Sequence, residues 1–209
     1  MTLDTLILFS IACLSLNLIP GPDVIYIVSN TMKGSIGNGI KASLGLGIGY
    51  FFHTLAACIG LSALILSSSV AFTLVKWLGA LYLAYLGCTA IYHAWKGKPK
   101  LAVDNQTVHN RGVLKQGIIV SILNPKVALF FLSFLPQFVD TAAGNTTYQL
   151  LFLGVWFTLL ATMCNLLYAL IGGWLLSQPK AASYAKIIEF ISGGLLLGLA
   201  GKIALDDAA

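Results

Sequence analysis

Charged residues are scarce in this chain of 209 residues: Asp, Glu, Lys and Arg make up only 9% of it. Ordinary soluble domains carry roughly 25% charged residues. Hydrophobic residues reach 58%, and the connections between the apolar stretches are too short to bury a core of their own. The composition therefore excludes a soluble domain, and we expect no nucleic-acid partner despite the net charge of +5.

Sequence patterns of metal and catalytic sites are also missing. The four cysteines, Cys13, Cys58, Cys88 and Cys164, lie in apolar stretches without a close pair or a second ligand at metal spacing. No HExxH, GxSxG or paired-carboxylate pattern occurs. We expect no bound metal, no cofactor and no enzymatic activity. No Lys or Arg precedes the first apolar stretch, so we expect that stretch to be a membrane span and not a cleaved signal peptide.

Six apolar stretches reach the length of about 20 residues that crosses a hydrocarbon core of roughly 30 Å as a helix. They cover residues 3–28, 40–66, 70–95, 112–135, 148–176 and 185–205. The sequence therefore predicts an all-α membrane protein with six transmembrane helices. We expect residues 1–209 to form a single transmembrane domain embedded in the lipid bilayer.

The basic residues predict the orientation of these spans. Because loops rich in Lys and Arg stay in the cytoplasm, the first, third and fifth connections are expected there and both termini in the periplasm. The linker at 96–111 is then cytoplasmic and suited to contact anionic lipid. Only Lys76 and Lys202 lie at the opposite membrane face. Nine basic residues lie in or near the first, third and fifth connections: Lys33, Lys41, Lys96, Lys98, Lys100, Arg111, Lys115, Lys180 and Lys186.

An internal repeat divides the chain at this linker into residues 1–95 and 112–209. Ile19-Pro20-Gly21 aligns with Asn124-Pro125-Lys126 at an offset of 105, and residues 75–80 align with 188–193 at an offset of 113. Because each half contains three spans, the second half runs through the membrane in the opposite sense. We predict two inverted three-helix repeats, with helices 1 and 4 broken at proline motifs, an architecture that suits alternating access.

The first break is the tetrapeptide Pro-Gly-Pro-Asp at residues 20–23. Proline has no backbone N–H and its ring clashes with the carbonyl four residues earlier, so the carbonyls of Leu16 and Leu18 lose their helical partners. In a membrane such groups must pack against protein or line a wet cavity. A plain kink is the alternative, but the carboxylate of Asp23 follows at once.

An acid and a base lie beside the two breaks. A charge at the centre of a bilayer costs about 3 kcal/mol on insertion scales, so Asp23 demands a partner, and Lys126 beside the second break is the natural one. The two form either a static ion pair or a site for a zwitterionic amino acid. Asp23 is the first candidate for proton coupling. The candidate substrate-binding residues are Pro20, Gly21, Pro22, Asp23, Tyr26, Asn124, Pro125 and Lys126.

Further polar residues follow helical spacing and are expected to face inward. Asn17, Thr158, Thr162 and Asn165 are candidates to line the cavity, although hydrogen bonding between helices is an equal alternative. His53 is the second candidate for proton coupling, because histidine titrates near neutral pH.

Two GxxxG pairs, Gly45 with Gly49 and Gly194 with Gly198, permit close helix packing. They suit contacts within one bundle or between two copies, so a homodimer stays an alternative.

Taken together, the ordered motifs resemble those of the LysE/RhtB superfamily of amino-acid exporters. They are Leu18-Ile19-Pro20-Gly21-Pro22-Asp23, the glycine-rich stretch 45–53, Lys76-Trp77-Leu78-Gly79-Ala80, Leu123-Asn124-Pro125-Lys126 and Phe134-Leu135-Pro136-Gln137-Phe138. The resemblance implies a secondary transporter of the bacterial inner membrane. It would export amino acids or derivatives of the homoserine, threonine, leucine or lysine type from the cytoplasm by proton antiport. The alternatives are an exporter of another metabolite or of a metal cation, and an intramembrane enzyme.

Overall fold

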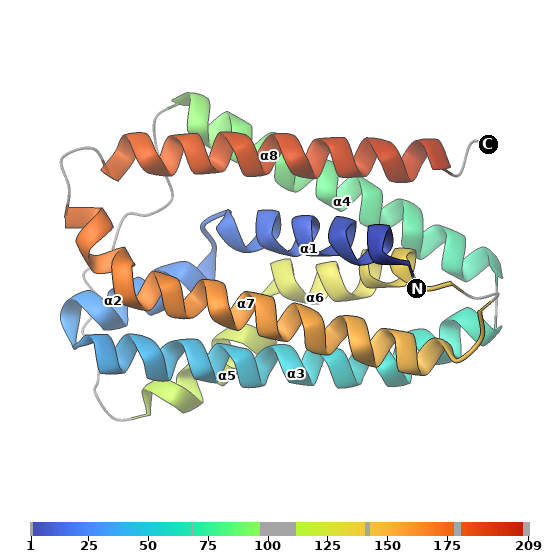
Figure 1. Ribbon diagram of the computed structural model, residues 1–209, viewed down its shortest axis with the longest axis horizontal. Coiled ribbons are helices and arrows are strands. Elements are labelled where there is room, and N and C mark those ends of the chain that lie inside the picture. The colour runs from blue at the N-terminus through green and yellow to red at the C-terminus, as the bar shows by residue number, and fades with distance from the viewer. Residues whose placement is uncertain (1, 68, 97–111, 141–142, 178–180, 207–209) are drawn as a thin grey trace.

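The computed structural model of the protein describes residues 2–67, 69–96, 112–140, 143–177 and 181–206, and all regular secondary structure in these ranges is helical. No strand occurs in these ranges, so the all-α prediction is confirmed. Of the expected linker, residues 97–111 lie outside the described residues. The elements are α1 (Leu3–Leu18), α2 (Pro22–Lys33), α3 (Ile36–Ser67), α4 (Ser69–Lys96), α5 (Val113–Ile122), α6 (Pro125–Ser133), η1 (Leu135–Phe138), α7 (Thr146–Ser177) and α8 (Ala181–Asp206) (Figure 1).

Two to four of these helical segments are long and apolar enough to cross a membrane, counting only the described residues. Ile36–Leu61 and Thr146–Ile171 qualify alone. Leu3–Leu18 with Pro22–Met32 and Val113–Ile122 with Pro125–Phe138 qualify as bent pairs, with bends of 55° and 49°. The first and fourth predicted spans are therefore each broken into two helices, as the proline motifs predict.

Local sequence explains both breaks. In the first, Ile19 and Gly21 adopt extended backbone conformations on either side of Pro20, and Pro22 occupies the first turn of α2. In the second, the Asn124 side chain caps α6 by accepting a hydrogen bond from the backbone N–H of Lys126 at 3.0 Å. A proline in the first turn of a helix costs nothing, because its missing N–H would have no intrahelical acceptor there.

The helices form a bundle in which α4 packs along α8 on one side, while α3 packs against α7 and α5 on the other (Figure 1). Between them lies α1, which contacts both α7 and α8. In Figure 1, α1 begins and α8 ends at the same end of the molecule. The break after α1 is buried in this bundle, because Ile19, Pro20 and Gly21 are all buried.

Aromatic packing joins the two broken segments. The ring of Phe9 in α1 lies 6.3 Å from the ring centroids of Phe130 and Phe134 and 5.1 Å from that of Phe138. All four side chains are buried. This cluster fixes α1 against the segment that follows the second break.

The Gly45 and Gly49 pair is used inside the bundle. A methyl group on Gly45 would collide with the carbonyl oxygen of Leu114, and one on Gly49 would meet the side chain of Ser121, both in α5. By contrast, a methyl group on Gly194 or on Gly198 would meet no atom within 4 Å.

Candidate functional site

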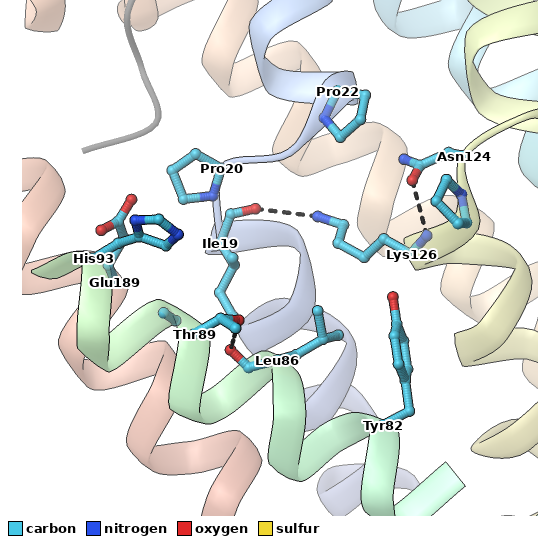
Figure 2. A pocket seen from close by; sticks show the side chains of 12 residues that line it. Ile19, Pro20, Pro22, Tyr82, Leu86, Thr89, His93, Asn124, Lys126 and Glu189 are labelled. Carbon is cyan, nitrogen blue, oxygen red and sulfur yellow. Dashed lines mark hydrogen bonds between the residues drawn. The ribbon is translucent and has the colours of Figure 1, made fainter. Parts of the chain in front are cut away.

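A cavity of about 140 Å³ lies where the two breaks approach α4 and α8 (Figure 2). The first break contributes Ile19, Pro20 and Pro22, and the second contributes Asn124, Pro125 and Lys126. Five of the eight predicted substrate-binding residues therefore line one cavity. The other side consists of Tyr82, Leu86, Thr89, Ala90 and His93 from α4 and Glu189 from α8.

Lys126 donates hydrogen bonds to backbone carbonyls that lose their helical donors at the first break. Its ammonium donates hydrogen bonds to the carbonyl oxygens of Leu16 and Ile19, each at 3.1 Å. The hydroxyl of Tyr168 in α7 donates to the carbonyl oxygen of Leu18 at 3.3 Å. The carbonyls of Leu16 and Leu18, which the sequence predicts to lose helical partners, thus receive side-chain donors from other helices.

Gly21 makes room for this ammonium. A methyl group built on Gly21 would lie 3.2 Å from Nζ of Lys126, closer than side-chain contacts normally come. The Gly21 backbone is extended and open to any residue, so a larger side chain here would be opposed by the position of the Lys126 side chain and not by the backbone conformation.

Asp23 lies behind the cavity in a buried network of hydrogen bonds. One carboxylate oxygen accepts from the hydroxyl of Tyr50 at 2.8 Å, and the other accepts from the side-chain amide of Asn124 at 2.7 Å. The Tyr50 hydroxyl in turn accepts from the side-chain amide of Asn165 at 2.9 Å. Each of the four side chains is at least 95% buried. The network joins α2, α3 and α7 to the cap of α6.

Asn124 connects the acid to the base. Its amide nitrogen donates to Asp23, while its amide oxygen accepts from the backbone N–H of Lys126. The ammonium of Lys126 points instead to the carbonyls of the first break. A neutral amide therefore connects the two charged residues, for which the sequence indicates either a static ion pair or a substrate site.

Other predicted residues serve helix contacts. The hydroxyl of Tyr26 donates to the backbone carbonyl of the first residue of α5 at 2.6 Å. Asn17 and Thr158 each donate to the carbonyl four residues earlier in their own helices. Thr162 packs against Gly47, where a methyl group would lie 2.6 Å from its hydroxyl. Of the four predicted cavity-lining residues, only Asn165 joins the network around Asp23.

His53 lies elsewhere. Its Nε2 is 3.0 Å from the carbonyl oxygen of Ser121, and its ring is 5.7 Å from that of Phe131. It lines a second pocket of about 380 Å³ whose other lining residues are apolar or glycine.

Glu189 and His93 line the cavity although the sequence analysis did not select them. Glu189 is only 2% exposed. The signal was present, because Glu189 is a carboxylate within an apolar stretch, the same criterion that selects Asp23.

Broken helices that bring charged groups and non-helical backbone to one buried position are a recurring feature of secondary transporters. The fold and site thus define a membrane transport protein. The sequence profile of the LysE type translocator family matches residues 14–207, and the chain belongs to this family. It is a transporter and not an enzyme.

Its curated relatives extend over nearly the whole chain. It is 31% identical over 195 residues to the leucine efflux proteins of Salmonella choleraesuis (strain SC-B67) and Salmonella typhimurium (strain LT2), a match that covers 90% of this chain and 88% of each relative. It is also 31% identical to the uncharacterized membrane protein YrhP of Bacillus subtilis (strain 168), covering 90% of this chain and 92% of that protein. No solved structure gives a significant match.

Proposed function

We propose that the protein exports amino acids or amino-acid derivatives from the cytoplasm and binds them in the cavity between the two breaks. The observation that carries this proposal is the Lys126 ammonium, which lines the cavity beside the backbone of the first break. Lys126 there can attract a substrate carboxylate. The relatives named leucine efflux proteins favour a neutral aliphatic amino acid.

The proposed membrane arrangement is six spans in two inverted repeats. Residues 1–209 then form one transport domain in the bacterial inner membrane, with both termini in the periplasm. The paired breaks support this arrangement, because each follows the first helix of its half and begins the next helix with a proline. A homodimer stays a prediction, and the open face at Gly194 and Gly198 would accommodate a second copy.

Proton antiport is the proposed driving reaction, with Asp23 as the coupling group. Tyr50 of α3 and Asn124 of the α6 cap donate hydrogen bonds to its carboxylate, and Asn165 of α7 donates one to the Tyr50 hydroxyl. Protonation of Asp23 would weaken its hydrogen bond with Asn124 and so alter the position of the second break. His53 is the alternative coupling group.

Toxicity rescue tests the substrate class. Cells that produce the protein should tolerate an excess of leucine or a similar amino acid, and should excrete it faster than cells with the Lys126→Met variant. Tolerance of a metal cation or another metabolite, without tolerance of any amino acid, would contradict the proposal and support the alternative exporters.

Transport in liposomes tests the coupling. An imposed pH gradient should accelerate leucine movement by the purified protein. The Asp23→Asn variant should still exchange leucine passively but lose that acceleration. If the variant keeps full gradient-driven transport, coupling belongs to another group, and His53→Gln is the next variant to measure.

A further inference from the structure

The cavity has a second charged wall that the paired breaks do not supply. Lys126 faces it from the second break, while Glu189 of α8 and His93 of α4 also line it. In Figure 2, Glu189 and His93 lie on one side of Ile19 and Pro20, and Lys126 lies on the other. A buried base and a buried acid thus border the same space from different helices.

Asp23 does not supply this acidic wall. Asp23 is not among the residues that line the cavity, whereas Glu189 is. Glu189 is the carboxylate that borders the space where a substrate would lie.

We propose that Glu189 binds the ammonium group of the substrate while Lys126 binds the carboxylate. The pair would select zwitterionic α-amino acids over carboxylates of the same shape. This inference rests on the proposed function and deepens it, because it names the chemical features by which the site recognises its substrate.

The dimensions of the cavity suit this assignment. A cavity of about 150 Å³ holds a ring of six carbon atoms in a well-studied protein. The space of about 140 Å³ found here therefore suits the main chain of an amino acid and its first side-chain carbon. Leu86 and Ala90 border the same space and offer apolar surface to an aliphatic side chain.

Competition in proteoliposomes provides the test. Transport of radiolabelled leucine is inhibited with unlabelled leucine or with 4-methyl-2-oxopentanoate, which has the same carbon skeleton and carboxylate but no ammonium. In Glu189→Gln, the concentration of leucine needed for half inhibition should rise at least tenfold, and that of the oxo acid should change less than threefold. A purely structural role would weaken both inhibitors by the same factor, and that result overturns the inference.

The control variant is Asp4→Asn, which removes an equal charge from an exposed position in the first turn of α1 and should change neither inhibition. Failure of the unmodified protein to transport any amino acid would contradict the proposed function itself. Normal transport by the unmodified protein, combined with an unchanged preference for leucine in Glu189→Gln, would contradict only the role of Glu189.

Carbodiimide labelling tests the same contact without a variant, should Glu189→Gln fail to fold. Leucine should slow modification of Glu189 in the purified protein at least fivefold, as measured by mass spectrometry of the labelled peptide, whereas the oxo acid should not. Equal labelling of Glu189 with and without leucine overturns the inference.

Discussion

The ammonium of Lys126 lies 3.1 Å from the carbonyl oxygen of Ile19, a residue 107 positions earlier in the chain. Ile19 directly follows the last residue of α1, and Lys126 is the second residue of α6. The second break therefore supplies the donor that the carbonyls of the first break lack.

Lys126→Met is expected to damage both stability and transport. It would leave the carbonyls of Leu16 and Ile19 without their donor, and an unsatisfied buried polar group costs about 1–3 kcal/mol. We expect a lower thermal unfolding midpoint in detergent and at least a tenfold loss of leucine transport. Lys115→Met, at an exposed position of α5, should leave both measurements unchanged. Normal transport by Lys126→Met would contradict the role of this ammonium.

Tyr50→Phe tests the network around Asp23. The Tyr50 hydroxyl donates to Asp23 and accepts from Asn165, so its removal leaves one buried acceptor and one buried donor unsatisfied. We expect a destabilisation of about 2 kcal/mol, measured by thermal unfolding. Tyr85→Phe, at a residue that is 62% exposed, is the matched control. Equal midpoints for the two variants would show that the network adds nothing to stability.

Replacing Pro20 and Pro22 together by alanine should repair the first break. Alanine restores the backbone N–H groups that can bond to the carbonyls of Leu16 and Leu18, and it favours continuous helix. Membrane insertion should persist while leucine transport falls at least tenfold, because the cavity would lose the extended backbone that borders it. Pro136→Ala in η1, which does not line the cavity, should retain most of the activity. Full transport by the double variant would mean that the break serves no function.

Gly45→Val should separate α3 from α5. Its side chain would collide with the carbonyl oxygen of Leu114, a backbone atom that cannot rotate away. We expect less folded protein in the membrane and a lower unfolding midpoint. Gly194→Val introduces the same side chain where no atom lies within 4 Å. A protein that acts as a monomer should therefore fold and transport normally with this substitution. A loss of function in Gly194→Val alone would point to a contact between copies.

Labelling in intact cells tests the predicted orientation. Single cysteines in the linker 96–111, on a background without the four native cysteines, should resist a membrane-impermeant thiol reagent, because the distribution of basic residues predicts a cytoplasmic linker. They should react once the cells are opened. Rapid labelling in intact cells would reverse the orientation.

Local chemistry made part of this protein predictable from its sequence. Proline lacks a backbone donor wherever it occurs, so the breaks at Pro20 and Pro125 and the exposed carbonyls of Leu16 and Leu18 follow from the residues themselves. The helical class follows as well, since a long apolar segment in lipid must satisfy its backbone internally. The same chemistry selects Asp23 and Lys126 as residues that need buried partners.

Only the tertiary structure decided which partners those are. A helix in a membrane is apolar on its lipid side as well as its buried side, so its sequence pattern does not reveal which residues face inward. The placement of Asn124 between Asp23 and Lys126 and the entry of Glu189 and His93 into the cavity therefore emerged from helix packing. His53 shows the same limit, because a polar residue within a span bonds to whichever carbonyl the packing brings near, here that of Ser121.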